Sequence, residues 1–242
     1  MIRTIIFWAI VAPHTMLYSV LVFIVAPFDR SGEIVLRLCR SWSRAILRLA
    51  GARVTVEGGE NIDVNTPRIF VSNHQSYFDV FALMAFLPGN ARFVAKKSLE
   101  YIPFFGQAMR AAGTVILDRN RPERAREELM HGARKNLTAI RGVVIFPEGT
   151  RSRDGSLGQF KLGGFMLAIQ AQVPIIPVAV TGSRDIMSAD SFQVRPGAIR
   201  IRIGKPIPTH GLSHDDRHKL MENVRDEVES LLKNGAAAAM AA

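Results

Sequence analysis

The sequence predicts an α/β fold in which helices flank a mixed, mostly parallel central sheet. The first observation behind this prediction is a series of short β-branched runs that begins at residue 53. The second is that helical patterns separate several of these runs, which is typical of folds with parallel strands. The third is that the first fifty residues differ from the rest and predict two helices in front of the sheet.

The first predicted helix covers residues 4–28, which carry no charge and are almost wholly apolar. Its length suits a membrane-embedded helix, which needs about 20 residues. Pro13 and His14 lie near its middle, where a polar ring is costly inside a bilayer. We therefore expect this segment to dip into one leaflet rather than to span; a buried core helix is the alternative. A cleaved signal peptide is disfavoured because the apolar run is too long.

The second predicted helix covers residues 33–51 and combines an apolar stripe with a row of arginines. The stripe consists of Val35, Leu38, Cys39, Trp42, Ile46 and Leu49, and the row consists of Arg37, Arg40, Arg44 and Arg48. This pattern is typical of an interfacial helix on anionic lipid, so the two helices predict a membrane-docking hairpin. The alternative is an ordinary helix whose apolar stripe faces the domain core.

The composition limits the partners. Lys and Arg outnumber Asp and Glu by 31 to 21, and the net charge of +10 implies nucleic acid, anionic lipid or a phosphorylated substrate. No nucleic acid is expected, because no basic patch interleaved with aromatic residues occurs. The single cysteine, Cys39, excludes an internal disulfide.

Polar residues gather at the ends of the predicted strands. The predicted strands are 53–58, 68–73, 92–97, 113–118, 143–149, 175–180 and 199–204, and the predicted helices are 78–87, 105–111, 122–140, 164–171 and 214–232. Ligands of α/β folds bind where strands end and loops begin. The loops after four strands carry His, Asp, Lys, Arg and Glu, so we expect them to converge on one site.

His74 and Asp79 lie at the seam between two apolar runs. Five residues apart on one helix they would point about 140 degrees apart and would not touch. If His74 precedes the first turn, its ring can fold back onto Asp79. The carboxylate then fixes one ring nitrogen and leaves the other as a general base. The alternative is that Ser76 or Asn73 caps the helix and His74 is an ordinary loop histidine.

A second polar loop, "FPEGTRS" at residues 146–152, follows an apolar strand. Pro147 and Gly149 predict a turn there. Arg151 offers a rigid fork that matches a phosphate. Glu148 is suited to bind a sugar or glycerol hydroxyl.

These loops resemble a known family. "NHQSYFD", "GTVILDR", "FPEGTRS" and "VPIIPV" resemble the four ordered blocks of the glycerolipid acyltransferases, and "FVAKKSLEYIPFFG" is similar to the bacterial 1-acyl-sn-glycerol-3-phosphate acyltransferases among them. The likeness covers roughly residues 54–205. It implies the glycerolipid acyltransferase fold. Gly51 ends the second predicted helix, so we expect a membrane-associated two-helix element at 1–50 and a catalytic domain at 51–235. The low-complexity end of the chain predicts a disordered tail at 236–242.

The resemblance also implies roles. His74 would be the base that deprotonates the free hydroxyl of a lysophospholipid, and Asp79 would orient it. Arg151 and Arg119 would hold the acceptor phosphate, with Lys96, or else Lys97, as a third cation. The residues that would bind the acceptor are Lys96, Arg119, Glu148, Gly149, Thr150 and Arg151, and Pro177 would shape the wall of the pocket.

The implied reaction takes an acyl group from acyl-CoA or acyl carrier protein to 1-acyl-sn-glycerol 3-phosphate at the cytoplasmic side of a bacterial inner membrane. No metal and no cofactor other than this co-substrate is implied, and His210, His214 and His218 are weak metal candidates because Gly211 breaks their spacing. Other acceptors remain open: glycerol 3-phosphate or another lysolipid, such as a lyso-ornithine lipid. A non-catalytic protein that binds anionic lipid is the alternative from another class.

Overall fold

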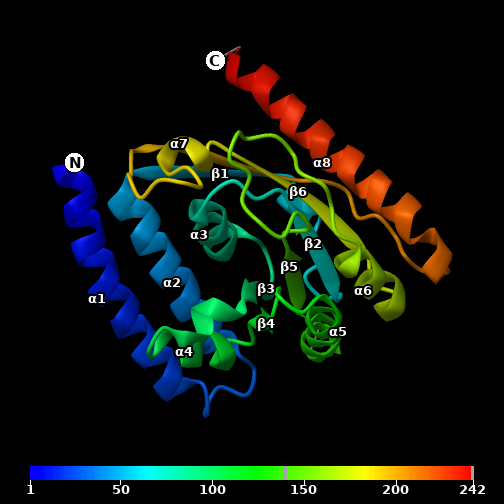
Figure 1. Cartoon of the computed structure of the whole chain (residues 1–242), viewed down its shortest axis with the longest axis horizontal. Helices are drawn as coiled ribbons and strands as arrows, with labels where there is room; N and C mark the ends of the chain where they lie inside the picture. The colour runs from blue at the N-terminus through cyan, green and yellow to red at the C-terminus, as the bar shows by residue number, and fades with distance from the viewer. Residues whose placement is uncertain (139–140, 241–242) are drawn as a thin grey trace.

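The centre of the computed structural model, which describes residues 1–138 and 141–240, is a seven-stranded sheet (Figure 1). Its strands are β1 (Ala52–Glu57), β2 (Arg68–Ser72), β3 (Ala91–Lys96), β4 (Val115–Leu117), β5 (Gly142–Ile145), β6 (Ile175–Thr181) and β7 (Gly197–Ile203). They lie in the order β1-β7-β6-β2-β5-β3-β4. Only the β6–β7 pair is antiparallel among these strands, which confirms the predicted mixed, mostly parallel sheet.

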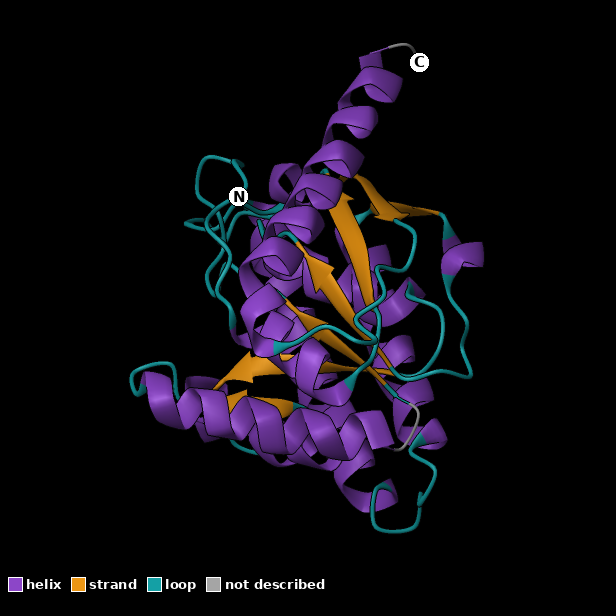
Figure 2. Ribbon diagram, turned by 90° about the vertical axis from the view of Figure 1, so that its right-hand side faces the viewer, coloured by secondary structure: helices purple, strands orange, loops and turns teal. Residues whose placement is uncertain are grey.

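Helices cover both faces of the sheet (Figure 2). One face carries α2 (Glu33–Ala50), α3 (Tyr77–Phe86) and α7 (Ser183–Ile186), with α1 (Ile2–Val25) packed outside α2 and against α4 (Phe105–Ala111). The other face carries α5 (Pro122–Thr138), α6 (Gly163–Ala171) and α8 (Arg217–Met240). Three short 3₁₀ helices are η1 (Gly59–Asn61), η2 (Lys97–Tyr101) and η3 (His214–Asp216). The predicted helix 122–140 extends to residues 139–140, which lie outside the described part.

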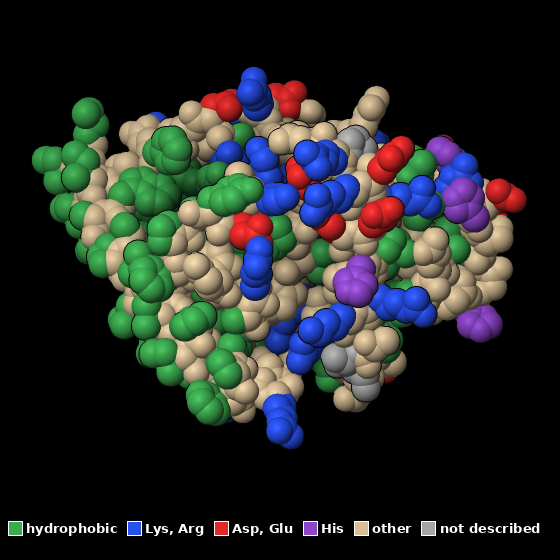
Figure 3. Space-filling model, turned by 60° about the horizontal axis from the view of Figure 1, so that its bottom comes forward, with side chains coloured by type: hydrophobic (Ala, Val, Ile, Leu, Met, Phe, Trp, Pro, Cys, Tyr) green, Lys and Arg blue, Asp and Glu red, His purple; other side chains and the backbone are tan. Residues whose placement is uncertain are grey.

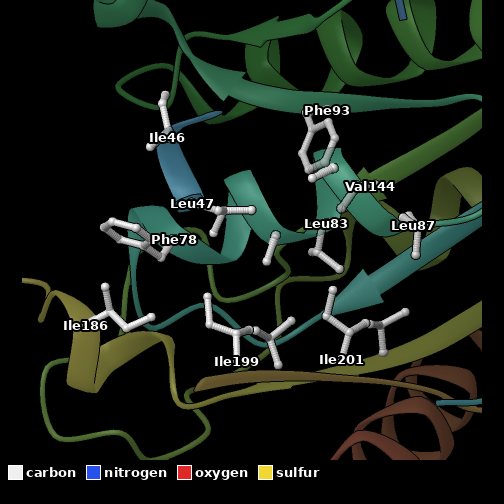
Figure 4. Packing of buried hydrophobic residues seen from close by; sticks show 14 of the residues in the cluster. Ile46, Leu47, Phe78, Leu83, Leu87, Phe93, Val144, Ile186, Ile199 and Ile201 are labelled. Carbon is white, nitrogen blue, oxygen red and sulfur yellow. The ribbon is translucent and has the colours of Figure 1, made fainter. Parts of the chain in front are cut away.

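The central strands are buried on both faces, so they read as continuous apolar runs. In β2, Phe70 points to the face of α2 and α3, whereas Ile69 and Val71 point to the face of α6. Figure 4 shows the first of these two clusters, where Leu47 of α2 and Leu83 of α3 pack above β7. Fully burying one such side chain contributes about 1.5–3 kcal/mol, and Phe70→Ala would cost about 3–5 kcal/mol.

The strand β5 ends at Ile145 rather than at residue 149. The backbone N–H of Gly149 donates to the carbonyl of Phe146 at 3.1 Å, and Gly149 has a φ of 72°. Pro147 has no N–H to give to a neighbouring strand. The predicted turn is therefore present, and it begins directly after the apolar run.

The lipid-facing interpretation of α2 needs correction. Arg40 donates to the carbonyls of Leu87 and Gly89 at 2.9 and 2.6 Å, and Arg44 donates to the carbonyl of Ala85 at 3.2 Å. The carbonyls of Ala85 and Leu87 lie at the C-terminal end of α3, where no further helical N–H can reach them, and that of Gly89 lies just beyond it. Arginines that the sequence assigned to lipid therefore cap a neighbouring helix.

The tryptophan of α2 also faces inward. The indole N–H of Trp42 donates to Thr15 of α1 at 3.1 Å, and its ring meets Phe81 of α3 edge-on. Ile46 and Leu47 are buried in the same cluster as the strands. The division at residue 50 therefore does not separate two cores, and α2 is the core-facing helix that the sequence offered as the alternative.

The last helix, α8, continues to Met240. It includes residues 236–240, where we expected a disordered tail; residues 241–242 lie outside the described part. The run of alanines accounts for this difference, because alanine has the highest intrinsic helix propensity.

Among the residues that the structure describes, one helix, α1, is long and apolar enough to cross a membrane by length and composition. Phe7 and Val11 face the core. The outward side is apolar as well: Ile5 is 64% exposed, Leu17 is 55% exposed and Ile24 is 57% exposed. An uncovered apolar surface of this kind marks a contact with a membrane or another protein.

Candidate active site

Four predicted loops meet at one edge of the sheet. The strands β2, β5, β3 and β4 are neighbours and run parallel, so their carboxyl ends lie together. His74 follows β2, Glu148 follows β5, Lys96 ends β3, and Arg119 follows β4. The four loops therefore share one edge of the sheet, as expected.

The end of β2 is locked to β6 by Asn73. Its side-chain amide donates to the carbonyl of Val180 at 2.9 Å, and its side-chain oxygen accepts from the N–H of Val180 at 2.7 Å. Asn73 is buried and thus takes the place of one more ladder pair. The carbonyl of His74 next accepts from the N–H of Ser152 at 2.8 Å, which ties it to the second loop. The backbone of His74 is therefore fixed on both sides.

The predicted contact between His74 and Asp79 is present. The helix α3 begins at Tyr77, so His74 lies before its first turn and can fold back. Asp79 Oδ2 accepts from His74 Nδ1 at 2.9 Å. The same oxygen accepts from the N–H of Ser76 at 2.8 Å and forms a capping box with it. The cap and the base–carboxylate pair, which the sequence presented as alternatives, coexist.

The ring of His74 is held on its face as well as on its edge. It stacks on Phe146, with ring centres 4.0 Å apart and planes 19° apart. Asp79 is fully buried, whereas the His74 side chain is 14% exposed. A buried acceptor at Nδ1 favours the tautomer that carries its proton there. Nε2 then has a free lone pair, which is what a general base needs.

Glu148 does not have the expected hydroxyl-binding geometry. Its Oε1 accepts from the N–H of His74 at 2.8 Å, and its Oε2 accepts from the N–H of Gly158 at 3.0 Å. Burial raises the pKa of the Glu148 carboxyl above its ordinary value, against the opposite effect of these two N–H groups. A buried carboxylate needs such donors. Glu148 therefore links the loop that carries His74 to the segment that carries Gly158.

Two of the predicted cations lie around the turn at Gly149. Arg119 donates to the carbonyl of Gly149, and burial lowers the pKa of its guanidinium. The guanidinium of Arg151 lies over the ring of Tyr77, 3.9 Å from its centre. Thr150, directly before Arg151 in the turn, is exposed. The positive charge therefore gathers beside the loop that carries His74.

The remaining candidates are Lys96, Lys97 and Pro177. Lys96 is exposed and pairs in register with Leu117, and no hydrogen bond or ion pair joins its side chain to another described residue. Lys97 Nζ lies 3.4 Å from Asp118 Oδ2. Pro177 is buried within β6, next to Val71 of β2. The structure thus places Arg119 and Arg151 at the turn, whereas Lys96 ends the strand between β5 and β4 and its side chain makes no contact with that turn that is a hydrogen bond or an ion pair among the described residues.

The roles of three residues of the site were not predicted from the sequence. Phe146 supports the ring of His74, Gly158 donates to Glu148, and Asn73 clamps β6 rather than capping a helix. Phe146 stands directly before the polar loop, and its position at the end of a buried strand was a usable signal. The partners of Asn73 and Gly158 depend on tertiary packing.

Comparisons with known proteins identify the family. Residues 53–181, more than half of the chain, match the family model described as Acyltransferase. Human 1-acyl-sn-glycerol-3-phosphate acyltransferase alpha is 36% identical over 185 residues, which cover 76% of this chain and 65% of that protein. The Saccharomyces cerevisiae 1-acyl-sn-glycerol-3-phosphate acyltransferase is 38% identical over 187 residues, which cover 76% of this chain and 61% of that protein. The chain thus spans less than two thirds of the length of these relatives.

A solved structure matches most of the fold. The crystal structure of the 1-acyl-sn-glycerophosphate acyltransferase PlsC from Thermotoga maritima aligns with a TM-score of 0.80 at 28% identity and covers 95% of each chain. This match confirms the predicted α/β architecture, including the helices in front of the sheet. The family model and the ordered motifs agree, so the chain belongs to the acyltransferase family.

Proposed function

We propose that the protein is a 1-acylglycerol-3-phosphate O-acyltransferase. It transfers a fatty acyl group from acyl-CoA or acyl carrier protein to the sn-2 hydroxyl of 1-acyl-sn-glycerol 3-phosphate and forms phosphatidic acid for phospholipid biosynthesis. The observation that carries the proposal is the 2.9 Å contact between His74 Nδ1 and Asp79 Oδ2 at the carboxyl edge of the sheet. The names of the relatives and of the structural neighbour support the choice of acceptor.

The reaction follows from the free nitrogen of His74. Nε2 takes the proton of the acceptor hydroxyl as the oxygen attacks the thioester carbonyl. The tetrahedral intermediate then expels the thiolate, and the imidazolium returns the proton to the sulfur. Asp79 holds the proton on Nδ1 and stabilises the imidazolium between the two steps. General base catalysis of this kind contributes about 100- to 10,000-fold.

The acceptor phosphate binds at the turn that contains Gly149. Arg151 and Arg119 approach the turn from two different loops, after β5 and after β4. A guanidinium binds phosphate through parallel charge-assisted hydrogen bonds. Burial of Arg119 strengthens its interaction with an anion because less water screens it.

The apolar side of α1 supports membrane docking. Figure 3 shows apolar side chains gathered on one side of the molecule, the side on which Figure 1 places α1. Tyr101 and Phe104, which precede α4 beside α1, are 74% and 50% exposed. This surface would lie in the cytoplasmic leaflet of the bacterial inner membrane and present the site to a lysophospholipid that stays in the bilayer.

An acceptor panel with one acyl thioester tests the proposal, and released thiol is the readout. We expect 1-acyl-sn-glycerol 3-phosphate to be the preferred acceptor over glycerol 3-phosphate and a phosphate-free lyso-ornithine lipid. His74→Ala should lower turnover about 100- to 10,000-fold. His131→Ala is the matched control, because His131 is exposed on α5.

Each contrary result removes a different part of the proposal. Near-wild-type turnover of His74→Ala would overturn the base assignment. Preference for another acceptor would overturn the substrate assignment. A wild-type protein that binds anionic vesicles but releases no thiol with any acceptor would favour the non-catalytic lipid-binding alternative.

A further inference from the structure

Lys161 lies over the same turn as Arg119, although it comes from a segment twelve residues farther along the chain than Gly149. Its backbone N–H donates to the carbonyl of Pro147 at 2.9 Å, which anchors it to the loop after β5. A Cβ placed on Gly149 would lie 2.8 Å from Lys161 Nζ and 3.1 Å from its Cε. The ammonium of Lys161 therefore rests against the bare Cα of Gly149.

Two cations thus meet at one glycine. Arg119 donates to the carbonyl of Gly149, and Lys161 lies against its Cα. Neither has a carboxylate within ion-pair distance among the described residues, whereas Lys97 has Asp118 at 3.4 Å. The nearby Glu148 already accepts two backbone N–H groups. Two uncompensated cations at a sheet edge repel each other, and a bound anion removes that repulsion.

The acceptor restricts where this anion can be. In 1-acyl-sn-glycerol 3-phosphate, two carbons and one oxygen separate the sn-2 oxygen from the phosphorus, so the phosphate must lie close to the base. The turn at Gly149 meets this condition, because Glu148 directly before it holds the N–H of His74.

We infer that Lys161 is a further phosphate-binding residue for the acceptor and forms an anion site with Arg119 and Arg151. The inference rests on the proposed function and assigns to Lys161 the place of the third cation, for which the sequence favoured Lys96. The inference also explains why position 149 requires a glycine, in addition to its φ of 72°. A larger residue there would push the ammonium away from the turn.

Binding without an acyl donor separates this inference from catalysis. The probe is 1-hexanoyl-sn-glycerol 3-phosphate, titrated calorimetrically into the full chain. Lys161→Met keeps most of the aliphatic stem and removes the charge, and we expect it to raise the Kd about tenfold. Lys161→Arg should restore most of the affinity. Lys135→Met on α5 is the control of equal charge change, because Lys135 is exposed and outside the site.

A second titration with 1-hexanoylglycerol, which lacks the phosphate, should show no difference between wild type and Lys161→Met. An unchanged Kd for the phosphate-bearing probe in Lys161→Met would overturn the inference, as would a tenfold effect in Lys96→Met with none in Lys161→Met. Equal weakening toward both probes would show that Lys161 supports the pocket and does not bind phosphate. If the wild type released no thiol while Lys161→Met still bound the phosphate-bearing probe more weakly than wild type, the result would count against the proposed reaction alone.

Discussion

Asp79 Oδ2 accepts the backbone N–H of Ser76 at 2.8 Å and, through the same atom, the Nδ1 proton of His74 at 2.9 Å. In return, Ser76 Oγ accepts from the N–H of Phe78 at 3.1 Å. One carboxylate oxygen therefore starts the helix α3 and orients the imidazole. Movement of the helix start would move the base with it.

This shared atom predicts that two neighbouring substitutions separate stability from catalysis. Ser76→Ala removes the cap and should lower the free energy of unfolding by about 1–2 kcal/mol with kcat almost unchanged. Asp79→Asn should lower kcat about 100-fold or more, because an amide can favour the other tautomer of His74. Urea titration and initial rates of thiol release measure both. Wild-type kcat in Asp79→Asn would contradict the orienting role.

Arg151 and Arg153 offer a second matched pair. Arg151 is partly buried over Tyr77, whereas the side chain of Arg153 is 81% exposed and lies near Asp190. Arg151→Ala should raise the acceptor KM about tenfold or more, the effect of one charge-assisted contact of about 1.5–3 kcal/mol, and leave the donor KM nearly unchanged. Arg153→Ala should change neither. A loss of the same size toward a phosphate-free lysolipid would show that Arg151 does not bind the phosphate.

The sequence was sufficient for the sheet and for the central pair. Periodicity located the strands because buried parallel strands are continuous apolar runs, as in β2 and β5. The contact between His74 and Asp79 could be predicted because the two residues are close in sequence and α3 begins between them. The alternation of strands and helices then placed four loops at one edge without any knowledge of strand order.

The sequence failed where the partner of a residue is remote. The arginines of α2 follow the pattern of a lipid-binding helix, and only packing shows that Arg40 and Arg44 bind the end of α3. Glu148 follows the pattern of a substrate ligand, yet two backbone N–H groups use both of its oxygens. Lys161 follows no motif that we recognised. The phosphate-binding role inferred for it depends on the packing of its ammonium against Gly149, which the sequence does not reveal.

Glu148 also predicts a pH dependence of stability. Burial raises its pKa in the folded state, so the unfolded state loses this proton at a lower pH. The unfolded state then binds fewer protons, and the contribution of Glu148 to stability falls as pH rises from near 4.5 through the raised folded pKa. Above that pKa the loss is constant.

Glu148→Gln should remove this slope. The amide has one acceptor for the N–H groups of His74 and Gly158, so one stays unpaired at a cost of about 1–3 kcal/mol. We therefore expect the variant to be less stable than wild type at low pH and the gap to narrow as pH rises through the window. Urea unfolding at several pH values provides the measurement. An equal slope in both proteins would assign the pH dependence to another group.

The exposed side of α1 predicts how the protein meets the membrane. Ile5 and Leu17 are exposed, so Ile5→Glu combined with Leu17→Glu should leave the fold intact and release the protein from anionic vesicles. Activity should fall more on long-chain acceptors than on soluble ones. Val64→Glu is the control, because Val64 is 48% exposed and belongs to the loop before β2 rather than to α1. Vesicle binding that survives the double substitution would exclude α1 as the docking element.

The N-terminal end of α1 predicts its topology. Arg3 donates to the carbonyl of Ala50 at 2.8 Å, and Trp8 donates to the carbonyl of Phe192 at 2.9 Å, so the first turns of the helix are held by the end of α2 and by the loop before β7. A span would have to break both contacts. A cysteine introduced by Ile2→Cys should therefore react with an impermeant maleimide in sealed inverted vesicles, where the cytoplasmic side is outside.

Labelling of this variant will be specific, because the native thiol is protected. Burial raises the pKa of Cys39 to about 11, so little thiolate is present near neutral pH, and thiolate is the reactive form. The unsubstituted protein should accordingly remain unlabelled in intact vesicles and supplies the background. Reaction of the introduced cysteine only from the periplasmic side would show that α1 crosses the bilayer, and the contacts of Arg3 and Trp8 could not then exist in the membrane-bound protein.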